Sequence, residues 1–294
     1  MSTIQRNRKE WFMNKNDRYR AIKKRLSDIA KTDETLKAVI AIGSSVRSCS
    51  AADEYSDIDL IIAATDTEKW LYGDMPSMLG EIKISFVEPT LGGGLERRML
   101  YDGSLDVDLI VFTPEQLISA VENGAAAEVM NRGYLIMHDA MGISAPINER
   151  IKLGTRTVEM TESEFANKVN DFWFHTVWAA KKILRGELWC AKMCIDAYLK
   201  NHLLSIIELD RYCTDKTDVW HSGRFFEQWA GGENVSALEN CFAHYNRADM
   251  ITALKNTAKL FSKSAKSAAK TCGFSYPENA ENYAQRLLAE YFPE

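Results

Sequence analysis

The sequence predicts an α+β fold in two domains: an N-terminal mixed β-sheet flanked by helices, followed by a C-terminal α-helical bundle. In the first half, short apolar runs of strand length alternate with segments of helical periodicity. From about residue 161 onward, long stretches with apolar residues at helical spacing follow one another. At 294 residues the chain exceeds the usual length of one domain, and we expect domains at 1–150 and 151–294.

The elements of the first half follow from local patterns. Apolar residues at helical spacing predict a helix over 17–31, and a compact β-rich run predicts a strand over 36–42. Similar runs predict strands over 58–63, 81–87 and 105–112. Thr113 and Pro114 then supply the cap and first turn of another helix.

The second half is expected to be entirely helical. Thr161 and Glu164 fit a capping box, so a helix should begin directly after Thr161. The helices predicted from the periodicity cover about 162–185, 187–209, 233–244, 247–271 and 278–291.

Composition narrows the class of protein. A formal net charge of −5 disfavours binding to a nucleic-acid backbone, and the one basic cluster, between Arg6 and Arg25, fits a solvated helix face. The longest apolar stretches are strand-sized, far short of a membrane span. No secretory signal pattern is present, and the six cysteines lack Cys-x-x-Cys spacing. We expect a cytoplasmic monomer that binds neither nucleic acid nor membrane.

Three aspartates carry the strongest functional signal. Asp57 and Asp59 are one residue apart at the head of an apolar run, and Asp108 lies in a second apolar run. Because side chains alternate along a strand, residues two apart present both carboxylates to one side, where a hard divalent cation can bridge them. Mg²⁺ is usually held by one or two carboxylates plus phosphate oxygens. The pattern therefore predicts a Mg²⁺-dependent nucleotidyl-transfer site, with a nucleoside triphosphate as co-substrate. Asp106 is in period with Asp108 and is the alternative third carboxylate.

A possible phosphate-binding turn precedes these acids. Gly43 and Ser44 end the first predicted strand, where backbone N–H groups and the Ser44 hydroxyl could donate to an anion. Arg47 could hold phosphate oxygens as well. A Gly-Ser pair alone indicates only a turn. Its spacing relative to Asp57, Asp59 and Asp108 is what matches the needs of phosphoryl transfer.

The segments Ala41-Ile-Gly-Ser-Ser-Val-Arg47, Tyr55-Ser-Asp-Ile-Asp-Leu60 and Val107-Asp-Leu109 resemble those of the DNA polymerase beta-like nucleotidyltransferase superfamily. More narrowly, the chain resembles the aminoglycoside 6-adenylyltransferase (streptomycin adenylyltransferase) family. The narrower resemblance covers most of the chain and rests on Phe172-Trp173, Lys181, Arg185-Gly-Glu187, Ala191, Ile195-Asp196, Leu203-Leu204 and the segment from Gly223 to Trp229.

This resemblance implies transfer of AMP from ATP to a hydroxyl of streptomycin, with Mg²⁺ as cofactor and release of pyrophosphate. It also implies an N-terminal nucleotidyltransferase domain and a C-terminal helical domain that completes the aminoglycoside cleft. In place of a Gly-Lys pair that is common in the family, this chain has Gly223-Arg224, and the preceding segment, residues 218–222, looks shorter. Arg224 is therefore a less secure phosphate contact than Gly43, Ser44 and Arg47.

The reaction also needs a base, since the attacking hydroxyl has a high pKa. Glu187 and Asp196 lie on a stretch that the resemblance places at the interdomain cleft. Nine residues on a helix separate them by roughly half a turn, so both should not face that cleft. Asp196 interrupts an apolar helix face and is the favoured base. Glu187 is the alternative. It is less favoured because it lies in a first helical turn, where an acid is expected for helix capping alone.

Streptomycin carries guanidinium groups, so its pocket should combine carboxylates with aromatic walls. The candidate side chains are Trp173, Trp178, Tyr198, Glu88, Asp102 and Glu187, although helix packing alone would explain the aromatic ones. Other readings stay open: the same chemistry on another antibiotic or on a protein, a catalytically silent nucleotide-binding module, or a nucleic-acid polymerase. The intact acids argue against a silent module, and the acidic net charge argues against a polymerase.

Overall fold

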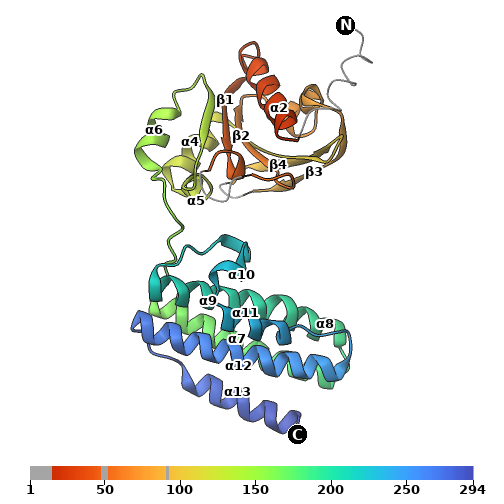
Figure 1. Cartoon of the computed structure of the whole chain (residues 1–294), viewed down its shortest axis with the longest axis vertical. Coiled ribbons are helices and arrows are strands. Elements are labelled where there is room, and N and C mark those ends of the chain that lie inside the picture. The colour runs from red at the N-terminus through yellow and green to blue at the C-terminus, as the bar shows by residue number, and fades with distance from the viewer. Residues whose placement is uncertain (1–14, 48–51, 91–92, 294) are drawn as a thin grey trace. The chain divides into compact units, whose positions relative to one another are not determined.

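The computed structural model describes residues 15–47, 52–90 and 93–293, so Cys49, Gly92 and the first part of the N-terminal basic cluster lie outside the described residues. The chain divides into two compact units, residues 1–155 and 156–294 (Figure 1). The first is an α+β unit and the second is helical, which confirms the predicted fold class. Within the described ranges, no helix combines the length and apolar character needed to cross a bilayer.

A six-stranded sheet forms the centre of the first unit, in the order β3-β4-β5-β2-β1-β6. The pair β2–β5 is parallel, and the other neighbouring strands are antiparallel, so the sheet is mixed. The strands are β1 (Leu36–Ile42), β2 (Ile58–Ala64), β3 (Ile82–Pro89), β4 (Leu95–Tyr101), β5 (Leu105–Phe112) and β6 (Leu135–Asp139). The central strands are apolar along almost their whole length, because helices cover both faces.

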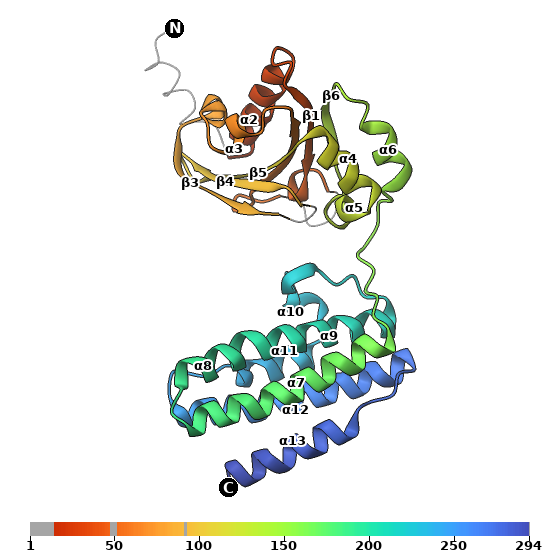
Figure 2. The same ribbon diagram turned by 180° about the vertical axis from the view of Figure 1, so that it is seen from behind.

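Each face of the sheet has its own helical cover (Figures 1 and 2). On one face, the helix α2 (Lys15–Ala30) and the short α3 (Glu68–Leu71) and η2 (Met75–Leu79) bury the alternate residues of β1, β2 and β5. On the other, the helices α4 (Pro114–Glu122), α5 (Ala125–Met130) and α6 (Ser144–Arg150) cover the complementary set. This division follows from the period-2 alternation of strand side chains.

Two strands of the sheet were not predicted. The strand β4 contains Glu96, Arg97 and Arg98 in succession, which hides its apolar residues from a periodicity argument. The short β6 ends in His138 and Asp139. The helix cap predicted at Thr113 is present, and it is a capping box with Gln116. The Thr113 hydroxyl accepts from the Gln116 backbone at 3.2 Å, and Gln116 Oε1 accepts from the Thr113 backbone at 2.8 Å.

The second unit is a bundle built on long helices. Helix α7 (Glu162–Leu184) begins with the predicted Thr161–Glu164 capping box. It is followed by α8 (Leu188–Met193), one π-helical turn, η4 (Cys194–Tyr198), and α9 (Leu199–Asp215). Helices α12 (Arg247–Cys272) and α13 (Glu278–Tyr291) complete the bundle. The short segments η5 (His221–Gly223), α10 (Phe226–Trp229), α11 (Gly232–Leu238) and η6 (Glu239–Cys241) connect α9 to α12.

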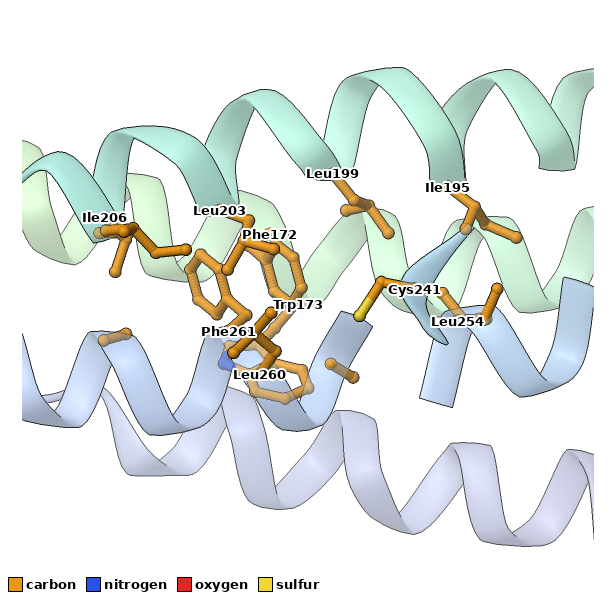
Figure 3. Packing of buried hydrophobic residues seen from close by; sticks show 14 of the residues in the cluster. Phe172, Trp173, Ile195, Leu199, Leu203, Ile206, Cys241, Leu254, Leu260 and Phe261 are labelled. Atoms are coloured by element: carbon orange, nitrogen blue, oxygen red, sulfur yellow. The ribbon is translucent and has the colours of Figure 1, made fainter. Parts of the chain in front are cut away.

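The bundle core is aromatic at its centre (Figure 3). Phe172 of α7 stacks on Phe261 of α12 with ring centroids 3.5 Å apart, and Trp173 packs edge-on against both rings. Trp173 is only 1% exposed, and its indole N–H donates to the Tyr276 hydroxyl at 3.1 Å. Trp173 is therefore part of the core, which confirms the helix-packing interpretation of this residue and leaves it no part in a pocket wall.

Helices α9 and α12 run parallel to each other. Lys200 Nζ, near the start of α9, donates to Thr257 Oγ1 in the first half of α12 at 2.8 Å, and near the ends of both helices the thiols of Cys213 and Cys272 are in contact. Parallel neighbours need a connection that returns along their full length. Residues 216–246 form this connection, which explains why so many short helical turns occur there.

Candidate functional site

The sheet register brings the predicted acids together in the first unit. Asp59 on β2 is directly opposite Asp108 on the parallel strand β5, so both side chains project from the same face. Asp57 lies in the loop just before β2. One carboxylate oxygen from each of Asp57, Asp59 and Asp108 lies within 4.8 Å of the other two. Asp106, the alternative third carboxylate, is exposed and is not a member of this group.

These three carboxylates suit a hard divalent cation. Asp108 is 3% exposed, and its Oδ1 is buried with no protein donor among the described residues. A buried carboxylate oxygen without a donor is costly, and a cation bound there would remove that cost. Oxygen ligands from carboxylates are also the donor set that Mg²⁺ prefers. The side chains present therefore fit a divalent metal ion.

Gly43 makes room for the acidic group. Its backbone is left-handed, with φ +72°, and a Cβ at this position would lie 1.9 Å from Asp59 Oδ2. Only glycine tolerates both conditions. The group that approaches Gly43 in this structure is thus the Asp59 carboxylate. Gly43 also starts η1 (Gly43–Ser45), a single 3₁₀ turn.

Strand β4 supplies a counter-charge that sequence reasoning missed. Arg98 Nη2 donates to Asp108 Oδ2 at 2.6 Å, and the same guanidinium lies 3.2 Å from Glu96 Oε1 and 3.5 Å from Glu88 Oε1. Arg98 therefore holds Oδ2 of Asp108 and leaves Oδ1 without a donor among the described residues. Burial, followed by repulsion from Asp108, raises the pKa of Glu96 to about 7.

Helix α2 contributes two further groups. Lys23 Nζ donates to Ser45 Oγ in the η1 turn at 2.8 Å, and burial lowers the pKa of Lys23 despite the opposing charge of Asp59. The Tyr19 hydroxyl donates to the Ser56 carbonyl at 2.8 Å and accepts from the Asp106 backbone at 3.1 Å. Tyr19 thereby ties the loop before Asp57 to the start of β5. Neither residue stands out in the sequence, because α2 carries many charged side chains and Tyr19 fits its row of apolar packing positions.

The predicted phosphate-contacting residues fall in both units. Ser44 follows β1, and its buried Oγ has no protein partner among the described residues. Arg47 lies just beyond, and its backbone N–H bonds to the Gly43 carbonyl at 3.3 Å. Arg224 is in the second unit and is exposed. Around it, Ser222 and Phe225 both have φ +56°, a conformation that non-glycine residues rarely adopt and that recurs at functional loops.

The two candidate bases are in the second unit as well. Glu187 lies 2.5 Å from Lys182 Nζ and 2.6 Å from Arg185 Nε, and its hydrogen bond with Lys182 is the main reason that its pKa is lowered. Asp196 lies on the π-helical turn, where Lys192 binds its Oδ2. Asp196 Oδ1 is buried and accepts no hydrogen bond from the described residues. The role of base stays a prediction for both.

Comparison with known proteins identifies relatives over almost the whole chain. The curated aminoglycoside 6-adenylyltransferase of Bacillus subtilis (strain 168) is 22% identical over 267 residues, which cover 86% of this chain and 91% of that protein. The crystal structure of an aminoglycoside 6-adenyltransferase from Bacillus subtilis aligns with a TM-score of 0.45 and 17% identity, covering 92% of this chain and 97% of that one. A nucleotidyltransferase-like protein from Exiguobacterium sibiricum 255-15 gives a TM-score of 0.34 and 14% identity, covering 84% and 75%.

A profile of the streptomycin adenylyltransferase family matches residues 18–290. This match spans both compact units, including the acidic group and both candidate bases. The chain therefore belongs to the streptomycin adenylyltransferase family of nucleotidyltransferase enzymes.

Proposed function

We propose that this enzyme transfers AMP from ATP to a hydroxyl of an aminoglycoside, with the 6-hydroxyl of streptomycin as the leading acceptor, and releases pyrophosphate. The observation that carries the proposal is the convergence of Asp57, Asp59 and Asp108 beside the Gly43–Ser45 turn, in a chain of this family. The proposal also places the enzyme in the cytoplasm, because the reaction consumes ATP. It takes the enzyme to be a monomer.

The first unit is assigned to ATP and Mg²⁺. Asp57, Asp59 and Asp108 would hold Mg²⁺, which when bound neutralises charge on the reacting phosphate and on the leaving pyrophosphate. The Gly43–Ser44 turn and Arg47 orient phosphate oxygens, and Lys23, anchored on Ser45, adds a positive charge to that turn. Arg98 fixes the rotamer of Asp108 through its 2.6 Å bond. Arg224 is proposed as a further phosphate contact from the second unit.

The second unit is assigned to the acceptor and the base. In the proposed step the acceptor oxygen bonds to the α-phosphorus, the bond from that phosphorus to the bridging oxygen of pyrophosphate breaks, and the hydroxyl proton passes to a carboxylate. Asp196 is favoured, since its Oδ1 accepts no hydrogen bond from the described residues. Glu187 is less suited, because two cations hold it ionised and weaken it as a base.

A panel of acceptors tests the proposal. Purified enzyme with Mg²⁺-ATP would be given streptomycin, kanamycin, spectinomycin or lincomycin, with pyrophosphate release and product masses measured. We expect streptomycin to gain the mass of one AMP, and NMR of that product to locate the new bond at the 6-hydroxyl. Transfer of AMP to another compound would replace streptomycin as the proposed acceptor and leave the proposed reaction, AMP transfer from ATP, unchanged. If no acceptor is modified and no pyrophosphate is released, the proposal fails.

A further inference from the structure

The C-terminal ends of α9 and α12 meet at two cysteines. Cys213 lies in the last turn of α9, and Cys272 is the last residue of α12. Both are free thiols, and their sulfur atoms are 2.7 Å apart. Because the two helices run parallel, both thiols lie at the same end of the pair, and neither helix has to slide along the other to bring them together. The two atoms that a disulfide would join are therefore already in contact.

Small reagents can reach this pair. Cys213 and Cys272 are each partly exposed, whereas Cys194 and Cys241 are buried in the helical core. Buried cysteines in an apolar core are usually inert, because neither solvent nor reagent reaches the sulfur. Cys213 and Cys272 thus combine mutual contact with access from solvent.

The hydrogen bond between the thiols gives them different chemical roles. The Cys272 S–H donates to Cys213 Sγ. Burial, followed by this hydrogen bond, raises the pKa of Cys272 to about 12, with the charge of Asp210 adding to the shift and that of Lys216 opposing it. Cys272 is therefore protonated at neutral pH, and its S–H can stabilise a thiolate on Cys213. Since the thiolate is the nucleophile, Cys213 is the sulfur that reacts first with an oxidant.

We propose that Cys213 and Cys272 are a modification site that forms a reversible disulfide with hydrogen peroxide as the oxidant. The Cys213 sulfur attacks one peroxide oxygen, the O–O bond breaks, and the products are a sulfenic acid at Cys213 and a water molecule. The Cys272 sulfur then attacks the Cys213 sulfur, the S–O bond breaks, and the sulfenic oxygen leaves as a second water with the Cys272 proton. Each sulfur loses one electron, and the peroxide takes up both. A dithiol reductant restores the two thiols by exchange.

The bond would close a long segment of the chain. The two cysteines are 59 residues apart, and the segment between them contains the whole connection from α9 to α12, including Arg224. A cross-link restricts the unfolded chain more than the folded one, and the effect grows with the length of the closed loop. Disulfide formation should therefore stabilise the helical unit. It requires neither ATP nor an acceptor, and in a reducing compartment the resting state is the dithiol.

Peptide mapping of the full-length protein tests the pair directly. The wild-type protein would be treated with hydrogen peroxide, quenched with catalase, alkylated and digested with trypsin. Cleavage after lysine and arginine places Cys213 in peptide 212–216 and Cys272 in peptide 271–286. We expect these two peptides to be joined with the loss of two hydrogens, and to separate after treatment with dithiothreitol. Recovery of the two peptides only in separate, alkylated or overoxidised form would overturn the proposal.

Thermal unfolding of variants tests the assignment. We expect the Tm of the oxidised wild type to exceed that of the reduced form by about 5 °C or more. Cys213→Ser and Cys272→Ser should each lose this rise. Cys190→Ser is the matched control, because it removes an exposed thiol on α8 and should keep the rise. Each variant is compared with its own reduced form, so a lower starting Tm does not affect the result. An equal rise in Cys213→Ser, or its loss in Cys190→Ser, would contradict the assignment.

Discussion

At the scale of single residues, the candidate metal site depends on the close approach of the Asp59 carboxylate to Gly43. The left-handed turn at Gly43 lets the Asp59 carboxylate lie where a side chain would otherwise begin. The position of one carboxylate oxygen of Asp59 therefore depends on the absence of a Cβ in the η1 turn that follows β1. Lys23 is the second residue whose role depends on this turn, because it is anchored on Ser45.

Gly43→Ala should displace Asp59 and weaken divalent-metal binding. The new Cβ would meet Asp59 Oδ2 at 1.9 Å, and the backbone strain would add about 1–2 kcal/mol. Gly124→Ala is the control: its φ is +87°, with no atom within 4 Å of the added Cβ. We expect both variants to lower Tm but only Gly43→Ala to weaken Mn²⁺ binding, measured by electron paramagnetic resonance. Equal Mn²⁺ affinity in the two variants would refute the close-contact argument.

Lys23→Met should lower kcat/KM for ATP by about 10-fold or more, the usual effect of losing a hydrogen bond to a charged group. Lys23→Arg should recover part of that loss, since it keeps the charge. Lys24→Met is the matched control, because Lys24 is exposed and pairs with Asp28 on the outer surface of α2. Steady-state kinetics of the three variants would separate the roles. A similar ATP dependence for Lys23→Met and Lys24→Met would remove Lys23 from the site.

At the scale of elements, the π-helical turn η4 is held by a hydrogen bond from the side chain of Lys200. A π-turn changes the backbone hydrogen-bonding pattern of the helix and occurs often at functional sites. Here Lys200 Nζ donates to the Ile195 carbonyl of the turn at 3.0 Å and to Thr257 on α12 at 2.8 Å. Burial lowers the pKa of Lys200 to about 8. The buried amine of Lys200 thus links the turn that contains Asp196 to α12 by hydrogen bonds.

This amine should make stability depend on pH in alkaline solution. The pKa of Lys200 falls from 10.5 to about 8 on folding, so between these values the unfolded chain binds more protons than the folded one. The free energy of unfolding contributed by this group should therefore rise with pH from about 8 to 10.5. Lys200→Met should flatten that rise in urea titrations, whereas Lys259→Met, an exposed lysine on α12, should keep it. An unchanged slope in Lys200→Met would mean that its pKa is not lowered.

The sequence allowed prediction of elements wherever one periodicity dominated. Strand β5 and helix α13 have the predicted limits, and the helix caps predicted at Thr113 and Thr161 are present, because caps and periodic apolar runs are local signals. Strand β4 was missed because its charged run looks polar, yet Arg98 faces Asp108 only through sheet pairing. Asp57, Asp59 and Asp108 could be chosen by alternation, whereas Lys23 and Tyr19 could not, since their contacts depend on where α2 packs.

At the scale of the whole molecule, each hydrophobic cluster found among the described residues belongs to a single one of the two units. The sheet is buried by two clusters, all of whose residues precede residue 155, and the helical core draws only on residues after 156. The segment between α6 and α7 has no regular structure. Within the second unit, Arg156 pairs with the buried Glu208 at 2.9 Å, so the start of this unit is fastened to α9.

The helical unit should consequently fold without the first one. We expect a fragment of residues 156–294 to be helical by circular dichroism and to unfold cooperatively in urea, because its core is complete. This fragment should neither hydrolyse ATP nor transfer AMP from it, because Asp57, Asp59 and Asp108 are in the first unit. A fragment without a cooperative transition would show that the two units depend on each other for stability.

The rate of AMP transfer to streptomycin by Asp108→Asn, relative to wild type, tests the central claim most directly. Loss of this carboxylate should reduce the rate roughly 100- to 1,000-fold, because charge stabilisation at the reacting phosphate is lost, while Tm stays near the wild-type value. Asp106→Asn, two residues earlier on the same strand and exposed, should keep near wild-type activity. A near wild-type rate in Asp108→Asn would contradict the claim that Asp57, Asp59 and Asp108 form the metal site of the reaction.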